Sequence, residues 1–524
     1  MSVLPRLRMA SAVSACFAAP ILVGLVASRA SAQSTYTITP DETRVLFFED
    51  QDSDGVKELY SVPIDGSQAP QMLALARGAG VYFYAYATAS PDSSMALFFA
   101  AQTGTSERVH GVPADGSAGS FEYPFPAPGI SKGDTDPWFE ISPLGGRVLY
   151  WNEGASLHSA PIDSGSSVLL SGGATAVFGG AITPDDARVV FRSNEMYPGF
   201  VFPRLFVSAL DGSTGPTPLR GTITSGTVVF FQLSPGGATV AYIANQDAPA
   251  LVELYSVPSD ASALPVKLNP PLVAGGQVYF DFAITPDDER VVYRAEQDVD
   301  GVIEIYSVPL DGSGSSVQLN GPLVTGGGVS QQFQISSDGG LVVYLADERT
   351  NDVVELFSRA IAGGGPGRCI SGELVPGGDV THCAISASGR QVVFRADKLA
   401  DDDFGLFSVW IGGPFPHARP FPRGPWPLVQ LNGPLVAGGD VIESKISPDG
   451  RRVVYRADEE VNDTTELYSV PIGGGGAIKL NSALPSGDDV LTFQIGAGRV
   501  VYGASGEIYS VPIDASEPPV QLTF

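Results

Sequence analysis

A repeat of about 50 residues runs through this chain and limits its fold more than any other feature of the sequence. Four segments carry near copies of Ile-Thr/Ser-Pro-Asp, and six weaker relatives continue the same spacing. The spacing leaves no room for an ordinary interdomain linker, so residues 33–524 are predicted to form one array of ten units. The units start near Ile38, Ala89, Ile141, Ile182, Leu233, Ile284, Ile335, Ile385, Ile446 and Ile495.

Each unit has the pattern of four short strands joined by tight turns. Pro286-Asp287 suits a turn because Pro fixes φ and Asp bonds its own backbone, and Asp311-Gly312 suits a hairpin. The 62 Gly and 42 Pro residues of the chain would interrupt long helices, which also favours an all-β protein. In the sixth unit we expect strands at residues 278–284, 290–295, 304–308 and 317–319.

Four-stranded units of this length, repeated radially, are typical of a β-propeller. We therefore predict an all-β β-propeller of about ten four-stranded blades. Ten blades exceed the usual range of about four to eight, so one wide ring competes with two smaller abutting rings. The uniform spacing favours one ring. The last unit ends on its outer strand at residues 520–524, so the ring is expected to close by packing alone.

The repeat resembles a known family. Ser/Thr-Pro-Asp, then Val-Val-Tyr, then Glu-Leu-Tyr-Ser-Val-Pro and Asp-Gly are similar to the TolB-type propeller repeat over about residues 34–524. The resemblance implies the fold, whereas blades of this type serve colicin-import accessory proteins, peptidase propellers and sugar-processing lyases alike. The third unit departs from the pattern with Leu144 in place of the turn Asp. The eighth carries a Pro-rich stretch at 414–427, expected to be a surface loop or an arm that docks on a partner.

The N-terminal segment has the features of a secretory signal peptide. Arg6 and Arg8 precede an apolar run, and small residues end at Ala32, so residues 1–32 are predicted to be removed on export. The protein is then expected in the periplasm or outside the cell, and no later run is long and apolar enough to predict a membrane span. For Cys369 and Cys383, a disulfide and two separate core positions both stay open.

The charge balance bears on partners. The chain has 30 Lys and Arg against 57 Asp and Glu, a formal net charge of -27. Such a chain repels phosphate backbones, which argues against nucleic acid as a partner. We expect a monomer that binds a protein or an envelope component.

Catalytic motifs give little support for an enzyme. The four histidines lie in different units, and the motifs of zinc proteases, serine hydrolases and P-loop enzymes are missing from the sequence. The predicted function is a non-enzymatic binding or scaffolding module. The alternative is a carboxylate-based hydrolase or lyase that uses calcium.

Two loops carry candidate calcium ligands. The segments between the second and third strands of units one and six place carboxylates at alternating positions ahead of a Gly, a spacing of hard oxygen ligands that suits calcium. Ser61 and Ser307 stand where an EF-hand needs Glu, so the site would be of another kind. Otherwise these acids cap hairpin turns. The candidates are Asp50, Asp52, Asp54, Asp298 and Asp300.

A second acidic series precedes the first strands of the last three units. Each acid follows a glycine, and inner strands line a propeller axis, so the acids are expected to surround one channel mouth. Such a mouth would bind cations or a basic peptide; otherwise it is a solvated rim. The predicted partner-binding residues are Asp379, Asp440, Asp488 and Asp489. The repeated Arg294, Arg395 and Arg456 are expected to balance neighbouring acids.

Overall fold

The computed structural model describes most of residues 36–523. The signal peptide predicted at 1–32 and the Pro-rich stretch at 414–427 lie outside the described residues. In the part of the chain that is described, no helix is long and apolar enough to cross a membrane. The described ranges are 36–50, 57–74, 81–102, 108–123, 138–151, 156–163, 167–172, 176–194, 203–219, 226–364, 367–412, 428–496 and 498–523.

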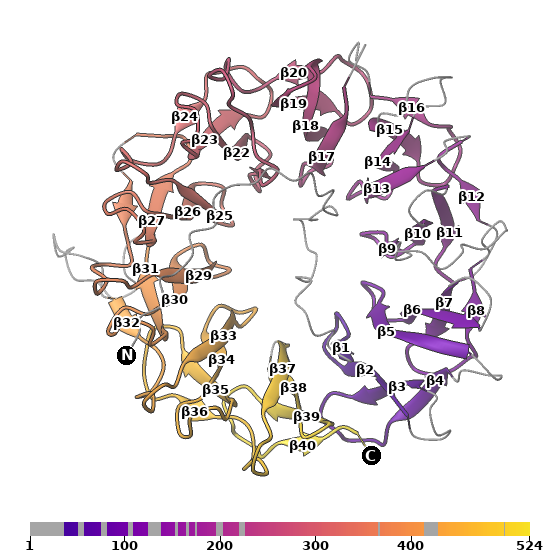
Figure 1. The fold of residues 1–524 in the computed structure, drawn as a ribbon. Helices are drawn as coiled ribbons and strands as arrows, with labels where there is room; N and C mark the ends of the chain where they lie inside the picture. The colour runs from indigo at the N-terminus through magenta and orange to yellow at the C-terminus, as the bar shows by residue number, and fades with distance from the viewer. Residues whose placement is uncertain are drawn as a thin grey trace, which may run out of the picture.

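Ten four-stranded antiparallel sheets stand around a ring, with the first strand of each toward the centre and the fourth at the rim (Figure 1). This arrangement confirms the predicted ten-bladed β-propeller. It also decides between the two open alternatives in favour of one wide ring, because the blade of β37–β40 lies beside the blade of β1–β4 (Figure 1).

The strand bounds follow one plan from blade to blade. Blades 1 to 3 consist of β1 (Tyr36–Ile38), β2 (Arg44–Glu49), β3 (Glu58–Pro63), β4 (Gln71–Ala74), β5 (Val81–Ala89), β6 (Met95–Gln102), β7 (Arg108–Pro113), β8 (Phe121–Glu122), β9 (Trp138–Ile141), β10 (Arg147–Trp151), β11 (His158–Pro161) and β12 (Val168–Leu169). Blades 4 to 6 consist of β13 (Val177–Ile182), β14 (Arg188–Asn194), β15 (Pro203–Ala209), β16 (Thr217–Pro218), β17 (Val228–Leu233), β18 (Thr239–Ala248), β19 (Leu251–Pro258), β20 (Val266–Lys267), β21 (Ala283–Ile284), β22 (Arg290–Ala295), β23 (Glu304–Pro309) and β24 (Val317–Gln318). Blades 7 to 10 consist of β25 (Val329–Ile335), β26 (Leu341–Ala346), β27 (Glu355–Ala360), β28 (Arg368–Cys369), β29 (Val380–Ile385), β30 (Gln391–Ala396), β31 (Gly405–Trp410), β32 (Leu428–Gln430), β33 (Val441–Ile446), β34 (Arg452–Ala457), β35 (Glu466–Pro471), β36 (Ile478–Lys479), β37 (Val490–Ile495), β38 (Arg499–Ala504), β39 (Glu507–Pro512) and β40 (Val520–Gln521).

The sixth blade differs from its predicted strands at one place. The first strand, expected at 278–284, is reduced to β21, and Val278 joins Ala295 only through an isolated bridge. Between that bridge and the pair Ala283–Val292, the inner segment has two more residues than its partner. The extra residues cannot pair and bulge out of the sheet.

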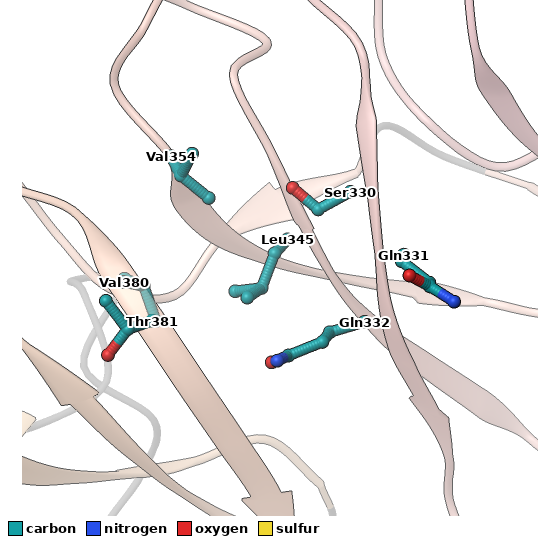
Figure 2. Close-up of a pocket in the computed structure, with 7 residues that line it drawn as sticks. All are labelled: Ser330, Gln331, Gln332, Leu345, Val354, Val380 and Thr381. Carbon is teal, nitrogen blue, oxygen red and sulfur yellow. The ribbon is translucent and has the colours of Figure 1, made fainter. Parts of the chain in front are cut away.

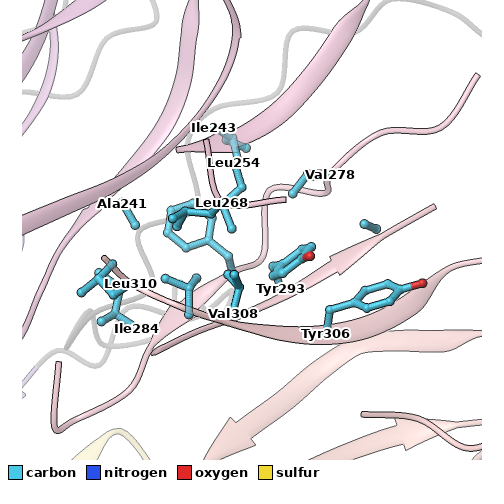
Figure 3. Packing of buried hydrophobic residues seen from close by; sticks show 13 residues of the cluster. Ala241, Ile243, Leu254, Leu268, Val278, Ile284, Tyr293, Tyr306, Val308 and Leu310 are labelled. Atoms are coloured by element: carbon cyan, nitrogen blue, oxygen red, sulfur yellow. The ribbon is translucent and has the colours of Figure 1, made fainter. Parts of the chain in front are cut away.

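A stacked aromatic pair joins the second and third strands of every blade. In blade 6, Tyr293 and Tyr306 stack with ring centroids 5.6 Å apart, beside a core that also takes Ile243 and Leu254 from blade 5 (Figure 3). His110 and His158 take the third-strand place in blades 2 and 3, against Phe98 and Tyr150. Two of the four histidines therefore belong to the packing. The other pairs are Phe47–Tyr60, Phe191–Phe206, Tyr242–Tyr255, Tyr344–Phe357, Phe394–Phe407, Tyr455–Tyr468 and Tyr502–Tyr509.

The last and first blades close the ring with a bond pair that also joins other blades. The amide of Gln494 accepts from the N–H of Ile38 at 3.1 Å and donates to the carbonyl of Tyr36 at 2.8 Å. Gln334 forms the same pair with β29, accepting from the N–H of Ile385 at 2.9 Å and donating to the carbonyl of Cys383 at 3.1 Å. The ring thus closes without a strand shared between blades, as predicted, and the hydrogen bonds of Gln494 add to the predicted packing.

Candidate functional site

Three aspartates predicted to face a channel mouth hold neighbouring blades together. Asp379 Oδ1 accepts from the N–H of Val354 at 2.6 Å, and the N–H of Val380 donates to the carbonyl of Val354 at 2.8 Å. The hairpin loop of one blade is thereby joined to the first strand of the next at two points. The same two-point bridge links Asp440 and Val441 to Phe404, and Asp489 and Val490 to Thr465, with carboxylate bonds of 2.7 Å in both.

Asp488, the fourth member, has a partner within its own blade. Its Oδ2 accepts from the hydroxyl of Ser505, in the turn between β38 and β39, at 2.8 Å. All four aspartates are half-buried and precede first strands, so they lie at one end of the ring, in blades 8 to 10. We call this the hairpin-loop end, because the loops between second and third strands lie there. Partner binding by these four residues stays a prediction.

Negative charge gathers where blades 7 and 8 meet at the hairpin-loop end. Burial raises the pKa of Asp379, and the nearby carboxylates of Asp397, Asp347 and Asp401 raise it further. Asp397 is buried, and it accepts hydrogen bonds from the backbone N–H groups of Asp379 and Asp402. The carboxylates of Asp397, Asp401 and Asp402 lie within 4.8 Å of one another. Such a group of oxygens could hold a cation, although Asp397 is already used as a backbone acceptor.

The predicted calcium ligands are dispersed. Asp298 and Asp300 are exposed in the hairpin loop of blade 6, where Asp298 Oδ2 accepts from the hydroxyl of Tyr306 at 3.3 Å. Asp50 is exposed at the end of β2, and Asp52 and Asp54 lie outside the described residues. Calcium binding by this set therefore stays a prediction.

The repeated arginines join blades as well as balancing charge. Arg294 pairs with Asp281, and Arg456 pairs with Glu443 at 3.1 Å, which confirms the expectation for these two residues. The guanidinium of Arg395 lies instead 4.0 Å from the ring centre of Phe404. Each of the three also donates to a carbonyl at the start of the next blade's first strand, namely Val329 for Arg294, Val441 for Arg395 and Val490 for Arg456.

A pocket of about 480 Å³ opens between blades 7 and 8. Leu345 lies between Thr381 of blade 8 and Gln332 of blade 7 (Figure 2). Val354 and Val380, the two residues joined by the bridge of Asp379, also line it. The pocket therefore combines an apolar floor with neutral polar walls next to a group of acids. The remaining lining residues are Ser330 and Gln331.

Cys369 and Cys383 are unpaired in the structure, which rejects the disulfide alternative. Cys383 lies in the core beside the pocket, and burial raises its pKa to about 12. Cys369 is half-buried, with its Sγ 3.4 Å from the hydroxyl of Ser371. Neither thiol has the lowered pKa of a reactive cysteine, because burial acts in the opposite direction.

Comparison with known proteins gives only weak structural likenesses. No protein-family model matches the chain, and no curated protein matches it in sequence. A solved structure described as TolB from Agrobacterium tumefaciens is 20% identical, with a TM-score of 0.29 over 44% of this chain and 78% of that one. Dipeptidyl peptidase 4 of Porphyromonas gingivalis is 10% identical, with a TM-score of 0.47 over 74% of this chain and 58% of that one. An oligogalacturonate lyase in complex with manganese is 14% identical, with a TM-score of 0.35 over 70% of this chain and 96% of that one.

The pocket was missed from the sequence. Its floor residue Leu345 stands where blades 6, 8 and 9 have arginine in the motif Val-Val-Tyr/Phe-Arg-Ala. An alignment of the ten units would have shown that this position lacks the arginine or aromatic residue found in most blades, as it also does at Ile243 and Gly503. It would not have shown that Val380 and Thr381 of the following blade leave a pocket across from Leu345.

Proposed function

We propose that this chain is an exported, non-enzymatic, TolB-like β-propeller that binds a protein or an envelope component and acts as a scaffold. The observation that supports this most is that charged side chains at the hairpin-loop end form hydrogen bonds between neighbouring blades. Asp379, Asp440 and Asp489 accept backbone N–H groups, while Arg294 and Arg456 hold the next blade. A general acid or base must be able to change its proton within reach of substrate, whereas these groups are tied to structure.

Exposed apolar side chains near the ring centre support binding. Leu491 in β37 is 61% exposed, Ile442 in β33 is 44% exposed, and Phe280, ahead of β21, is 55% exposed. Leu491 and Ile442 lie in the first strands of neighbouring blades, and exposed apolar side chains that adjoin polar ones are typical of protein-binding surfaces. The net charge of -27 favours a partner with a basic surface. Export rests on the signal-peptide features of residues 1–32.

A second candidate function is a carboxylate-based hydrolase or lyase that uses calcium. The observation in its favour is the group formed by Asp397, Asp401 and Asp402. Turnover of peptide or acidic polysaccharide substrates in the presence of calcium, abolished by Asp401→Asn, would favour this candidate over the binding module.

The proposal is tested by capture followed by measured affinity. The purified protein is cross-linked in an envelope extract, the partner is identified by mass spectrometry, and its Kd is measured with purified components. Leu491→Asp and Ile442→Asp are expected to weaken binding by about tenfold or more each, because they place charge in an apolar contact. Leu264→Asp is the matched control, since Leu264 is 69% exposed on the outer part of blade 5. Equal affinities for all variants, or turnover without a partner, would contradict the proposal.

A further inference from the structure

Neighbouring blades are packed at two positions that recur around the ring. The latch position is the second-strand residue that directly follows the stacked aromatic residue. In blade 6 this residue is Arg294, whose side chain reaches the next blade. The packing position is the first-strand residue that pairs with the stacked aromatic residue of the second strand. In blade 7 this residue is Phe333, which pairs with Tyr344. Both positions lie in the layer between two sheets, so a small residue at one leaves space that the other must fill.

Nine of the ten interfaces have an arginine or an aromatic residue in at least one of these positions, and all twenty positions fall within described residues. At closure, for example, Gly503 holds the latch position and Tyr36 fills the space, its ring 3.7 Å from a Cβ built on that glycine. In blade 6 the packing position is held by Phe282, which directly precedes the paired residue Ala283 and shares a core cluster with Tyr293. The large residues, in ring order, are Phe48, Phe99 with Phe139, Trp151, Arg192 with Phe231, Phe282, Arg294 with Phe333, Arg395, Arg456 with Phe493, and Tyr36.

The interface of blades 7 and 8 is the exception. Its latch position is Leu345 and its packing position is Cys383, which stands opposite Phe394. Both side chains are buried in one core cluster, and both are short. The pocket lies at this interface, with Leu345 at its floor (Figure 2). The pocket therefore opens where the latch position, held by Leu345, lacks the guanidinium that Arg294, Arg395 and Arg456 place at their own interfaces.

The chain's own arginines show how such a space is used. Arg456 Nη1 donates to the carbonyls of Val490 and Leu491 at 2.8 and 2.5 Å, where a bulge in β37 turns them toward the preceding blade. β29 has a bulge at the same place, between Val380 and His382, and both Val380 and Thr381 line the pocket. Arg294 and Arg395 also lie over the rings of Tyr279 and Phe404, at 5.3 and 4.0 Å. A planar, weakly hydrated guanidinium suits such a half-buried place better than an ammonium group.

We propose that the pocket between blades 7 and 8 binds an arginine side chain of a partner, in the place that the chain's own arginines take at other interfaces. This inference rests on the proposed function and names the chemistry of the partner. The methylene stem would lie on Leu345 and Val354, and the guanidinium would donate to the polar groups of blades 7 and 8.

The surrounding charge favours a cation over an aromatic side chain. Asp379 bridges two pocket-lining residues, and Asp347, Asp397 and Asp401 lie near enough to act on its carboxylate. The walls add the neutral hydrogen-bonding groups of Ser330 and Gln332, whereas the hydroxyl of Thr381 already accepts a hydrogen bond from Arg395 at 3.1 Å. An aromatic side chain would leave those groups without new partners, whereas a guanidinium brings five N–H donors.

Binding is tested with short blocked peptides. Acetylated and amidated Gly-Arg-Gly, Gly-Lys-Gly and Gly-Phe-Gly are compared by saturation-transfer NMR with the purified protein. We expect transfer to the arginine side-chain protons, with lysine and phenylalanine peptides at least about tenfold weaker. Equal signals from the arginine and lysine peptides, a stronger signal from the phenylalanine peptide, or no binding of the arginine peptide would each overturn the inference.

Filling the pocket from within gives a second measurement. Leu345→Arg is expected to restore a latch, raise Tm and abolish arginine-peptide binding, and Leu345→Phe fills the same space without a charge. Ile243→Arg is the matched control, since Phe282 already fills that interface and the added side chain should lower Tm. Undiminished peptide binding by both folded filling variants would overturn the inference.

Failure of this site can be told from failure of the proposed function. If a captured envelope partner binds Leu345→Arg as tightly as wild type, the proposed function stands while this site fails. If no partner is captured, the proposed function itself fails.

Discussion

The carboxylate of Asp186 in blade 4 accepts a hydrogen bond from the hydroxyl of Ser142 in blade 3 at 2.5 Å, and another from the N–H of Leu144 at 3.1 Å. In the regular turn, the Ser or Thr hydroxyl donates to an Asp two residues later, as Thr183 does to Asp185 at 2.6 Å. Blade 3 has Leu144 at that place, and the following blade supplies the missing acceptor.

Removing the Asp186 carboxylate should therefore weaken blade 3, and glycine is the suitable replacement because Asp186 has a φ of 56°, which alanine disfavours. Asp186→Gly is expected to lower the free energy of unfolding by about 1–3 kcal/mol, because Ser142 loses a charged acceptor. Leu144→Asp restores an acceptor within blade 3 and should recover most of the loss, at little other cost since Leu144 is 70% exposed. Urea unfolding of the four proteins measures the coupling. Additive effects would show that the bond between blades contributes nothing.

Tyr36 is expected to be the main residue of ring closure. Its hydroxyl donates to the carbonyl of Val501 at 3.2 Å, and its ring covers Gly503. Tyr36→Ala should cost about 3–5 kcal/mol, whereas Tyr36→Phe should cost only about 1 kcal/mol. Adding Gly503→Arg to the alanine variant should recover part of the loss by placing a latch there. Thermal unfolding checks this order, and similar Tm values for the Ala and Phe variants would contradict it.

The acidic series can be tested without disturbing its bridges. Asparagine keeps the Oδ1 acceptor that Asp379, Asp440 and Asp489 offer to backbone N–H groups, and it removes the charge. The triple Asp→Asn variant should keep nearly the same Tm and associate more slowly with a basic partner at low salt. Stopped-flow association rates across ionic strength provide the measurement. An unchanged rate at low salt would place the binding surface elsewhere.

Calcium binding by the hairpin-loop acids predicts a stabilised native state. Millimolar calcium should raise Tm, because a ligand bound only by the folded chain stabilises it by mass action, and magnesium should do so less. Asp54→Asn combined with Asp300→Asn should remove the effect. The same calcium shift in that variant, or no shift in the wild type, would leave these acids as turn-capping residues.

Stability is expected to fall as pH rises across the neutral range. Burial raises the pKa of Glu140 in β9 to about 8, from 4.5 for an exposed glutamate. The folded chain then binds more protons than the unfolded chain between these two pH values. The contribution of Glu140 to the free energy of unfolding is therefore complete below about pH 4.5 and is lost as pH rises through about 8. Glu140→Gln should flatten this part of the profile, by about 1–2 kcal/mol after solvent screening. Urea midpoints from pH 5 to 9 check the sign, and a profile unchanged by the substitution would reject it.

Features that lie within one blade could be predicted from sequence. The hydroxyl of Thr285 bonds Asp287 two residues away, and the turn and its flanking strands repeat as one local pattern. The roles of the acids could not be predicted in this way. The partner of Asp379 is a backbone N–H 25 residues earlier, in another blade, and composition near Asp379 does not show which surface its carboxylate faces.

The sequence by itself determined the number of blades, their four strands and their turns, because period, alternation and turn chemistry act over a few residues. Only the tertiary structure decided that the ten blades make one ring, since Gln494 and Tyr36 are 458 residues apart and meet through packing. It also decided which interface stays open. Leu345 is an ordinary core residue in its own strand, and it lines a pocket only because Val380 and Thr381 of the next blade lie across from it. Space between sheets depends on the summed volume of side chains from two blades, and no single repeat contains that sum.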